Sequence, residues 1–190
     1  MRLFVGLSLP NEVRQSLSGL CTGLDGARWV NSENLHMTLR FVGEIGGGEA
    51  GDLDAVLGAV SAPEFDLQCR GIGHFGKAAK VRAIWAGLGP CPPLARLQEK
   101  VESAVARAGF GAEGRKFKPH ITLVRFRRRP PRSLGAYMEA NGAFSTPPFS
   151  VNAFTLFESH MGHGGSHYVA LKDYRLDPVD GRKTLEGDKT

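Results

Sequence analysis

The sequence predicts an α+β protein of two similar halves, each an antiparallel sheet with helices on its outer face, with a central cleft between the sheets. A four-residue pattern occurs twice in the 190-residue chain, as His36-Met37-Thr38-Leu39 and as His120-Ile121-Thr122-Leu123. Each copy lies in an apolar, strand-like run and follows a strand and an amphipathic helix. The implied repeat of about 80 residues is longer than the roughly 20–50 residues of most solenoid repeats, which favours two lobes. We expect a single bilobal domain over residues 1–176 and a charged tail over residues 177–190.

Apolar periodicity and turn residues place the elements of the first half. Pro10 begins a helix, because the amide hydrogen that proline lacks would be unpaired at the first helical position anyway. Three glycines at residues 46–48 indicate a loop before the next helix. The expected elements are strand 2–9, helix 10–23, strands 28–30 and 35–42, helix 49–60 and a strand-like run over 65–75.

The second half repeats this order and then adds two strands. A basic loop that contains prolines follows the second motif over residues 127–132, and the charged tail is expected to fray. The expected elements are strand 82–89, helix 93–108, strands 115–117 and 120–126, a short helix 132–141 and strands 149–158 and 167–176.

Strand geometry brings the polar residues of each motif to one face of its sheet. Side chains alternate along a strand, so His36 and Thr38 point to one side, as do His120 and Thr122, while the apolar motif residues point to the other. Two imidazoles and two hydroxyls that face one space suit acid–base chemistry on a phosphate, because histidine titrates near neutral pH. We expect Arg125 to follow Thr122 and face the same cleft, where its guanidinium matches phosphate geometry.

Composition limits the class of protein. The formal net charge of +5 favours a polyanionic partner, and a hydrophobic content of 42% is ordinary for a globular chain. The three cysteines form no CxxC pair and are expected to stay reduced in the cytoplasm. The sequence has no apolar stretch of about 18 residues, so we expect no membrane span.

The motifs, their order and their spacing resemble the two-histidine phosphoesterases, specifically the bacterial and archaeal RNA 2′,3′-cyclic phosphodiesterases, also called 2′-5′ RNA ligases. The resemblance covers about residues 1 to 176. The segments that carry it are 2–10 (RLFVGLSLP), 34–39 (NLHMTL) with Gly43-Glu44, 118–123 (KPHITL) with Arg125, and 154–159 (FTLFES) with Gly165, Tyr168 and Leu171.

This resemblance implies hydrolysis of RNA 2′,3′-cyclic phosphate ends, with tRNA fragments among the candidate substrates. It implies that His120 activates water and that His36 protonates O3′, which gives a 2′-phosphomonoester. Thr38, Thr122 and Arg125 would hold the phosphate, without a metal ion or a nucleotide cofactor. With an RNA 5′-hydroxyl in place of water, the reverse reaction would form a 2′-5′ linkage. We expect a cytoplasmic monomer.

Several aromatic residues are harder to place. The resemblance implies a base-stacking platform near Phe75, and stacking on an aromatic ring contributes about 1–3 kcal/mol per base. Phe41, Trp85 and Phe126 lie in strand-like runs and fit best in the core, although Phe41 is also a candidate substrate contact.

Histidines near the C-terminus suggest two further roles. His167 stands where the family often has a basic residue, so a protonated His167 could contact substrate phosphate. The spacing of His160, His163 and His167 could instead fit a metal ion, although this segment is rich in glycine and contains no carboxylate.

Two alternative functions stay open at this stage. One is a phosphodiesterase for a small cyclic phosphate, such as a cyclic mononucleotide or ADP-ribose 1″,2″-cyclic phosphate; the basic loop 127–132 favours a polymer instead. The other is a module that binds RNA ends without catalysis, which would have no need for two titrating imidazoles.

Overall fold

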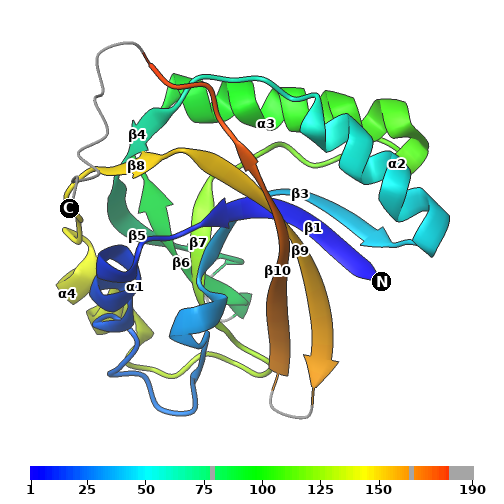
Figure 1. Cartoon of the computed structure of the whole chain (residues 1–190). Helices are drawn as coiled ribbons and strands as arrows, with labels where there is room; N and C mark the ends of the chain where they lie inside the picture. The colour runs from blue at the N-terminus through cyan, green and yellow to red at the C-terminus, as the bar shows by residue number, and fades with distance from the viewer. Residues whose placement is uncertain (78–79, 163–164, 180–190) are drawn as a thin grey trace, which may run out of the picture.

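The computed structural model describes residues 1–77, 80–162 and 165–179, which contain an eight-stranded antiparallel sheet (Figure 1). The strand order is β10 (Gly165–Arg175), β9 (Ala153–Gly162), β1 (Arg2–Ser8), β3 (His36–Glu44), β7 (His120–Arg125), β6 (Ala83–Leu88) and β5 (Cys69–Phe75), with β2 (Arg28–Trp29) paired to β7.

Two half-sheets meet in the middle of this sheet. The first half-sheet is β10-β9-β1-β3 and the second is β7-β6-β5, and they join where Met37 of β3 pairs with Ile121 of β7. A separate two-stranded sheet pairs β4 (Phe65–Leu67) with β8 (Phe149–Val151). The predicted α+β class with antiparallel sheets is confirmed, and the two lobes correspond to half-sheets connected through the two histidine motifs.

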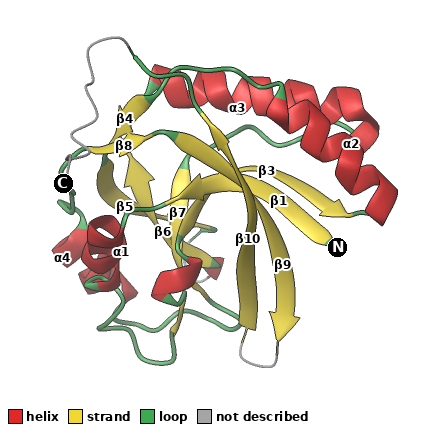
Figure 2. Cartoon of the chain, in the orientation of Figure 1, coloured by secondary structure: helices red, strands yellow, loops and turns green. Residues whose placement is uncertain are grey.

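The helices lie in two pairs, and each pair combines one helix from the first half of the chain with one from the second half (Figure 2). Helices α2 (Gly47–Gly58) and α3 (Pro92–Val105) lie together beside the first half-sheet, where α3 contacts β3. Helices α1 (Asn11–Ser18) and α4 (Leu134–Asn141) lie beside the second half-sheet, where α4 contacts β5 and the Tyr137 hydroxyl donates to the carbonyl of Leu20 at 2.7 Å. Each half-sheet is thus covered by a helix from the other half of the chain.

Apolar residues on the helix-facing side of the sheet, among them Leu7, Met37 and Ile121, form a large buried cluster with helix residues such as Leu97 of α3. A smaller cluster around Ile84, Val124 and Tyr137 lies under the second half-sheet. Burial of apolar area is the main stabilising term in folding, so the sheet face that carries these residues is fixed. The opposite face carries polar residues and several aromatic rings.

A buried ion pair connects the two halves. Arg40 of β3 is 6% exposed, and its Nε lies 2.5 Å from Oε2 of Glu102 on α3. Its Nη2 donates to the carbonyl of Gly111 at 2.6 Å, and the amide of Glu113 donates to Glu102 at 2.8 Å. These bonds fix residues 111–113, which precede β7, against β3.

Several element boundaries differ from those the sequence predicted. No strand forms over residues 115–117, where the sequence predicted one. Helix α2 begins at Gly47 within the predicted glycine loop, where the Glu49 side chain accepts from the Gly46 amide at 2.7 Å and caps the helix. The run over 65–75 is interrupted at Gln68, so that β4 and β5 join different sheets.

The structured part of the chain extends one residue beyond the predicted domain end. Asp177, expected in the fraying tail, bonds through its amide to Ala62 at 2.8 Å and through its carboxylate to Ser61 at 2.5 Å. The rest of the predicted tail from residue 180 lies outside the described residues. Among the helices of the described ranges, none is long and apolar enough to cross a membrane.

Candidate active site

The junction between the half-sheets places both motifs side by side. Met37 and Ile121 pair across it, and both are fully buried on the helix-facing side. His36 and Thr38 flank Met37, and His120 and Thr122 flank Ile121, so all four point to the opposite face. Each of these four polar residues is half-buried. The predicted juxtaposition of two imidazoles and two hydroxyls follows from this antiparallel pair.

The backbone holds the His36 ring in one orientation. Its Nδ1 lies 2.7 Å from the carbonyl oxygen of Asn34, which can only accept, so Nδ1 carries a hydrogen. Its Nε2 lies 3.1 Å from the Thr38 hydroxyl. Aromatic rings surround this imidazole, with Phe4 at 4.8 Å between ring centroids and Tyr168 edge-on at 4.9 Å.

The Asn34 side chain connects this wall to the hairpin of β9 and β10. Its Nδ2 donates to the carbonyl of Ser166 at 2.8 Å, and its Oδ1 accepts from the amide of Tyr168 at 3.2 Å. Asn34 is only 8% exposed, so these bonds satisfy a buried amide. Asn34 therefore fixes both the tautomer of His36 and the strand whose Tyr168 packs against it.

The His120 ring is held in the same way by its own motif. Its Nδ1 lies 2.7 Å from the carbonyl of Lys118, and Phe75 packs edge-on at 4.8 Å between centroids. The Lys118 ammonium lies 4.6 Å from the centroid of the Trp85 ring, a cation–π contact. The Trp85 ring covers Gly73, where a Cβ would lie 2.2 Å from it, so a side chain at that position would displace the ring.

β-Bulges follow both motifs and decide which later residues share the face of the two histidines. The register of β1 with β3 skips Leu39, and the register of β6 with β7 skips Leu123. A bulge adds one residue and reverses the faces of the residues that follow. The fifth residue after each histidine therefore returns to the face of that histidine. It is Phe41 in the first half and Arg125 in the second.

The bulge brings Arg125 to the predicted face despite its odd spacing of three residues from Thr122. Phe41 is 48% exposed, so the interpretation of Phe41 as a core residue is wrong. Trp85 pairs with Thr122 and is half-buried on the face of the two histidines, whereas Phe126 packs against the smaller core cluster as expected.

Burial and nearby cations disfavour protonation of both imidazoles. Burial lowers the pKa of His36 to about 4; the bond to the Asn34 carbonyl opposes this, and the positive charges of Arg125 and His120 add to it. Burial also lowers the pKa of His120, opposed by the bond to the Lys118 carbonyl and reinforced by the charges of Arg125 and Lys118. At neutral pH His36 is therefore neutral in the empty site, with Nε2 as an acceptor.

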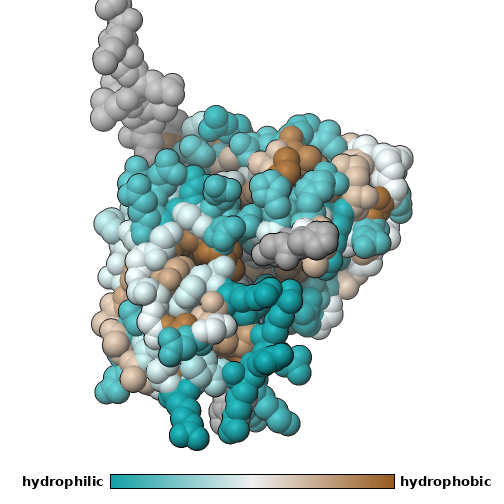
Figure 3. Space-filling model, turned by 90° about the horizontal axis from the view of Figure 1, so that it is seen from below, coloured by the Kyte–Doolittle hydropathy of each residue, from teal (hydrophilic) through white to brown (hydrophobic). Residues whose placement is uncertain are grey.

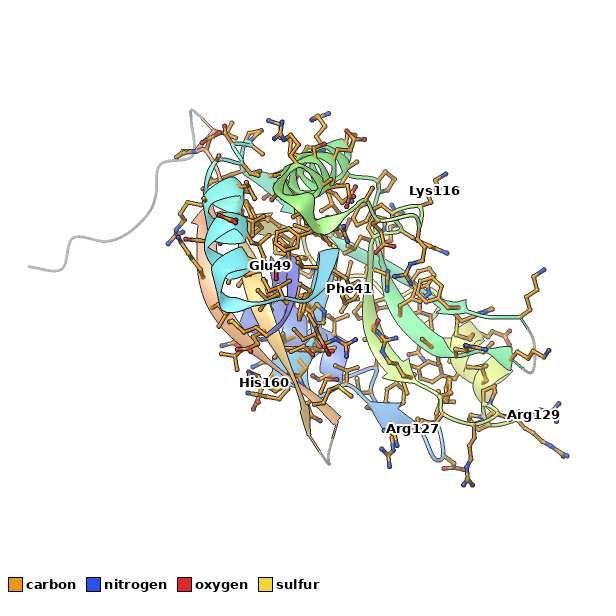
Figure 4. All side chains as sticks on the ribbon, turned by 90° about the vertical axis from the view of Figure 1, so that its right-hand side faces the viewer. Phe41, Glu49, Lys116, Arg127, Arg129 and His160 are labelled. Carbon is orange, nitrogen blue, oxygen red and sulfur yellow. The ribbon has the colours of Figure 1, made fainter. Side chains whose placement is uncertain are left out.

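Other candidate residues lie apart from this group. His167 pairs with His160, and strand alternation turns both away from the face that Tyr168 shares with His36. His160 lies 3.3 Å from Glu158, and His163 lies outside the described residues. No cluster of three or more metal-ligating side chains occurs within the described ranges. The basic loop carries exposed arginines, and Figure 4 shows Arg127 and Arg129 pointing outward below the strands.

The sequence analysis did not identify Asn34, Lys118 and Trp85 as site residues. Asn34 and Lys118 each stand two residues before a motif histidine, a shared position that could have indicated their shared role as carbonyl acceptors. Trp85 gave no such signal, because its orientation depends on the bulge and on Gly73 of the neighbouring strand.

Comparison with known proteins agrees with this arrangement. The family model described as "LigT like Phosphoesterase" matches twice, over residues 7–85 and 88–168. An Escherichia coli K12 protein named RNA 2′,3′-cyclic phosphodiesterase is 31% identical over 92% of this chain and 96% of its own length, and a protein of the same name from Archaeoglobus fulgidus is 31% identical over 90% and 98%.

Solved structures resemble the whole fold. A Thermus thermophilus protein superposes with a TM-score of 0.77 at 28% identity, over 93% of this chain and 98% of its own. The apo structure of E. coli LigT gives a TM-score of 0.73 at 29% identity, over 92% and 96%. The chain belongs to the LigT-like phosphoesterase family.

Proposed function

We propose that this protein hydrolyses RNA 2′,3′-cyclic phosphate ends to 2′-phosphomonoesters. The observation that carries the proposal is the pair of imidazoles whose Nδ1 atoms are bonded to backbone carbonyls, which turns each Nε2 toward the face that the two motifs share, where the Nε2 of His36 contacts the Thr38 hydroxyl. The names of the curated relatives support this substrate class. Other structures of E. coli LigT hold phosphate or 3′-AMP, which supports a phosphate site in this fold.

In the proposed reaction a water oxygen bonds to phosphorus as the bond from phosphorus to O3′ breaks. His120 removes a proton from that water through Nε2, and His36 donates a proton to the departing O3′. After the step His120 is protonated and His36 is neutral, so a proton exchange with solvent restores the starting state. Histidine suits both tasks because its unperturbed pKa lies near neutral pH.

The remaining cleft residues stabilise charge on the phosphate. Arg125 presents a guanidinium that can bind two non-bridging oxygens, and the hydroxyls of Thr38 and Thr122 can donate to them. Such preorganised donors favour a transition state in which negative charge builds on the non-bridging oxygens.

Substrate charge also decides the protonation of His36. The pKa of about 4 in the empty site would leave His36 deprotonated, which does not suit an acid. A bound phosphate anion favours the imidazolium and raises this pKa, because an opposite charge nearby stabilises the charged form. We therefore expect His36 to become protonated when the anionic RNA end binds, which prepares it to donate a proton to O3′.

Aromatic rings on both sides of the site supply surfaces for the nucleoside. Phe75 and Trp85 form a wall beside His120, with ring centroids 5.6 Å apart. We propose that the terminal base stacks on this wall, and Phe41 offers a second exposed ring on the other half.

We propose RNA as the partner and a monomer as the active form. The three cysteines are unpaired, as expected for a cytoplasmic protein. The proposed mechanism needs no metal ion or nucleotide cofactor.

The test is to incubate the protein with an RNA that bears a 2′,3′-cyclic end and to identify the product isomer. We expect a 2′-phosphate, a bell-shaped pH profile of kcat/KM, and no effect of EDTA. A 3′-phosphate product, or activity restored to EDTA-treated protein by a divalent ion, would contradict the mechanism. Faster turnover of ADP-ribose 1″,2″-cyclic phosphate than of any RNA would contradict the substrate.

A further inference from the structure

A second arginine lies beside Arg125 in the sheet. Strand β2 pairs with β7 so that Arg28 stands directly opposite Arg125 and Trp29 opposite Val124. Paired residues point to the same face, so Arg28 shares the face of Arg125. The orientation of the next residue supports this placement of Arg28. Trp29 packs against Tyr137 in the smaller core cluster on the opposite face, with ring centroids 5.9 Å apart.

Within the described part of the chain, no carboxylate forms an ion pair with either guanidinium. Both side chains are exposed. Like charges directly opposite each other destabilise a strand pair. A cross-strand arginine pair of this kind becomes favourable when a polyanion binds over it, because arginine forks bind phosphate oxygens in pairs.

The pair also lies at the end of the site that is next to the basic loop. β3 and β7 run antiparallel, so Phe41 and Arg125 lie at opposite ends of the junction between the half-sheets. Beyond Arg125 the chain continues into the basic loop, whose residues Arg127 and Arg129 extend away from Phe41 (Figure 4). Hydrophilic side chains gather on the lower face of the molecule (Figure 3).

We propose that Arg28 binds the phosphodiester that precedes the cyclic phosphate in the RNA chain, beside Arg125, which holds the reacting phosphate. This inference rests on the proposed function and deepens it, because it makes Arg28 the residue that distinguishes an RNA end from a cyclic mononucleotide. A mononucleotide has no phosphate at this position, whereas a dinucleotide with the same cyclic end has one.

The experiment compares three substrates: a 2′,3′-cyclic mononucleotide, a dinucleotide with that cyclic end, and the same dinucleotide with an uncharged methylphosphonate linkage. We expect Arg28→Ala to lower kcat/KM about 10-fold more on the charged dinucleotide than on the mononucleotide, as loss of a charge-assisted contact predicts. Wild-type protein should prefer the charged dinucleotide to its methylphosphonate analogue by a similar factor, and Arg28→Ala should lose that preference.

Two variants serve as controls. Arg28→Lys keeps the charge and should retain part of the preference, and Arg175→Ala removes an exposed arginine from β10 and should retain all of it. Removing Arg28 should not lower Tm, because it relieves a like-charge pair. An Arg28→Ala variant that loses Tm and all three activities together would show a structural role and overturn the proposal.

The outcomes separate this inference from the proposed function. If wild-type protein turns over none of the three substrates, the proposed function fails. The role of Arg28 is then read from the affinity for a dinucleotide 2′-phosphate with a charged or uncharged linkage. If Arg28→Ala still discriminates between the two linkages as wild type does, Arg28 does not bind that phosphate.

Discussion

His36 and His120 are held by similar backbone contacts, but the charged side chains around them differ. In each half the carbonyl two residues upstream accepts from Nδ1, an aromatic ring packs edge-on, and a bulge follows at the motif leucine. The side chains then diverge. Asn34 and Phe41 in the first half correspond to Lys118 and Arg125 in the second.

This difference shows how two similar backbone frames can place two histidines in unlike environments. Hydrogen bonds to the backbone fix the geometry of both rings, and these depend little on which side chains surround them. The side chains set the electrostatics: the charge of Arg125 acts on both rings, whereas the charge of Lys118 acts on His120. Acid–base catalysis by two histidines needs unequal environments of this kind.

The largest expected effect is loss of either imidazole. His36→Ala and His120→Ala should each lower kcat/KM on cyclic-ended RNA by about 10²–10⁴-fold. Because the halves act as one unit, the double variant should lose far less than the product of the two single effects. Circular dichroism should show that all three variants are folded. Retention of about a third of the activity by either single variant would mean that the halves do not share the reaction.

The next effect tests the two residues that stand five positions past each histidine. Arg125→Ala should lower kcat by about 10²–10³-fold on mononucleotide and RNA alike, because it removes a donor to the charge of the transition state. Phe41→Ala should affect KM more than kcat, since Phe41 offers an apolar surface and no charge. Equal losses of kcat in Arg125→Ala and Phe41→Ala would contradict the proposal that Arg125 stabilises the transition state and that Phe41 only binds substrate.

A third effect concerns stability against pH. The pKa of His36 is about 4 in the folded chain and 6.5 in the unfolded chain, so between these values the unfolded chain binds a proton that the folded chain does not. Its contribution is fully present above pH 6.5 and is lost as the pH falls toward 4, by up to about 3 kcal/mol.

Urea unfolding of wild type and His36→Asn near neutral pH and near the lower pKa measures this contribution. The variant should lose less stability on acidification than wild type does. If wild type and His36→Asn lose the same stability on acidification, then burial does not keep the His36 ring neutral, and the proposed environment of His36 is wrong.

The smallest effect on the chemistry is expected from the basic loop of the second half. Replacing Arg127, Arg128, Arg129 and Arg132 with Ala should weaken binding of long RNA and flatten its salt dependence, because each lost phosphate contact releases one fewer counterion. Turnover of a cyclic mononucleotide should barely change. Unchanged RNA affinity across salt concentrations would show that this loop does not contact RNA, and a loss of mononucleotide turnover as large as that of Arg125→Ala would place it within the site.

The sequence was sufficient for the parts of the site that depend on local periodicity. His36, Thr38, His120 and Thr122 repeat a pattern whose alternation alone defines a polar face. The α+β class followed from the same repeat, and the family model that matches each half supports the duplication.

The remaining features depend on contacts between distant segments. The pairing of Arg28 with Arg125 joins residues 97 positions apart (125 − 28) and leaves no local mark. The exposure of Phe41 depends on a bulge that periodicity does not reveal. The missing strand at 115–117 has a similar cause, because the segment that precedes it is fixed by Arg40 and Glu102 rather than by a strand partner.

The buried ion pair of Arg40 has a mechanical consequence. It connects β3, which carries His36, to α3 and to the segment that leads into His120. Residues 111–113, which begin the segment that leads to His120, cannot leave β3 and α3 without breaking the bonds of Arg40 to Gly111 and of Glu113 to Glu102. We expect the start of this segment to stay against β3 throughout turnover, so that any movement of His120 relative to His36 is limited to what residues 114–119 allow.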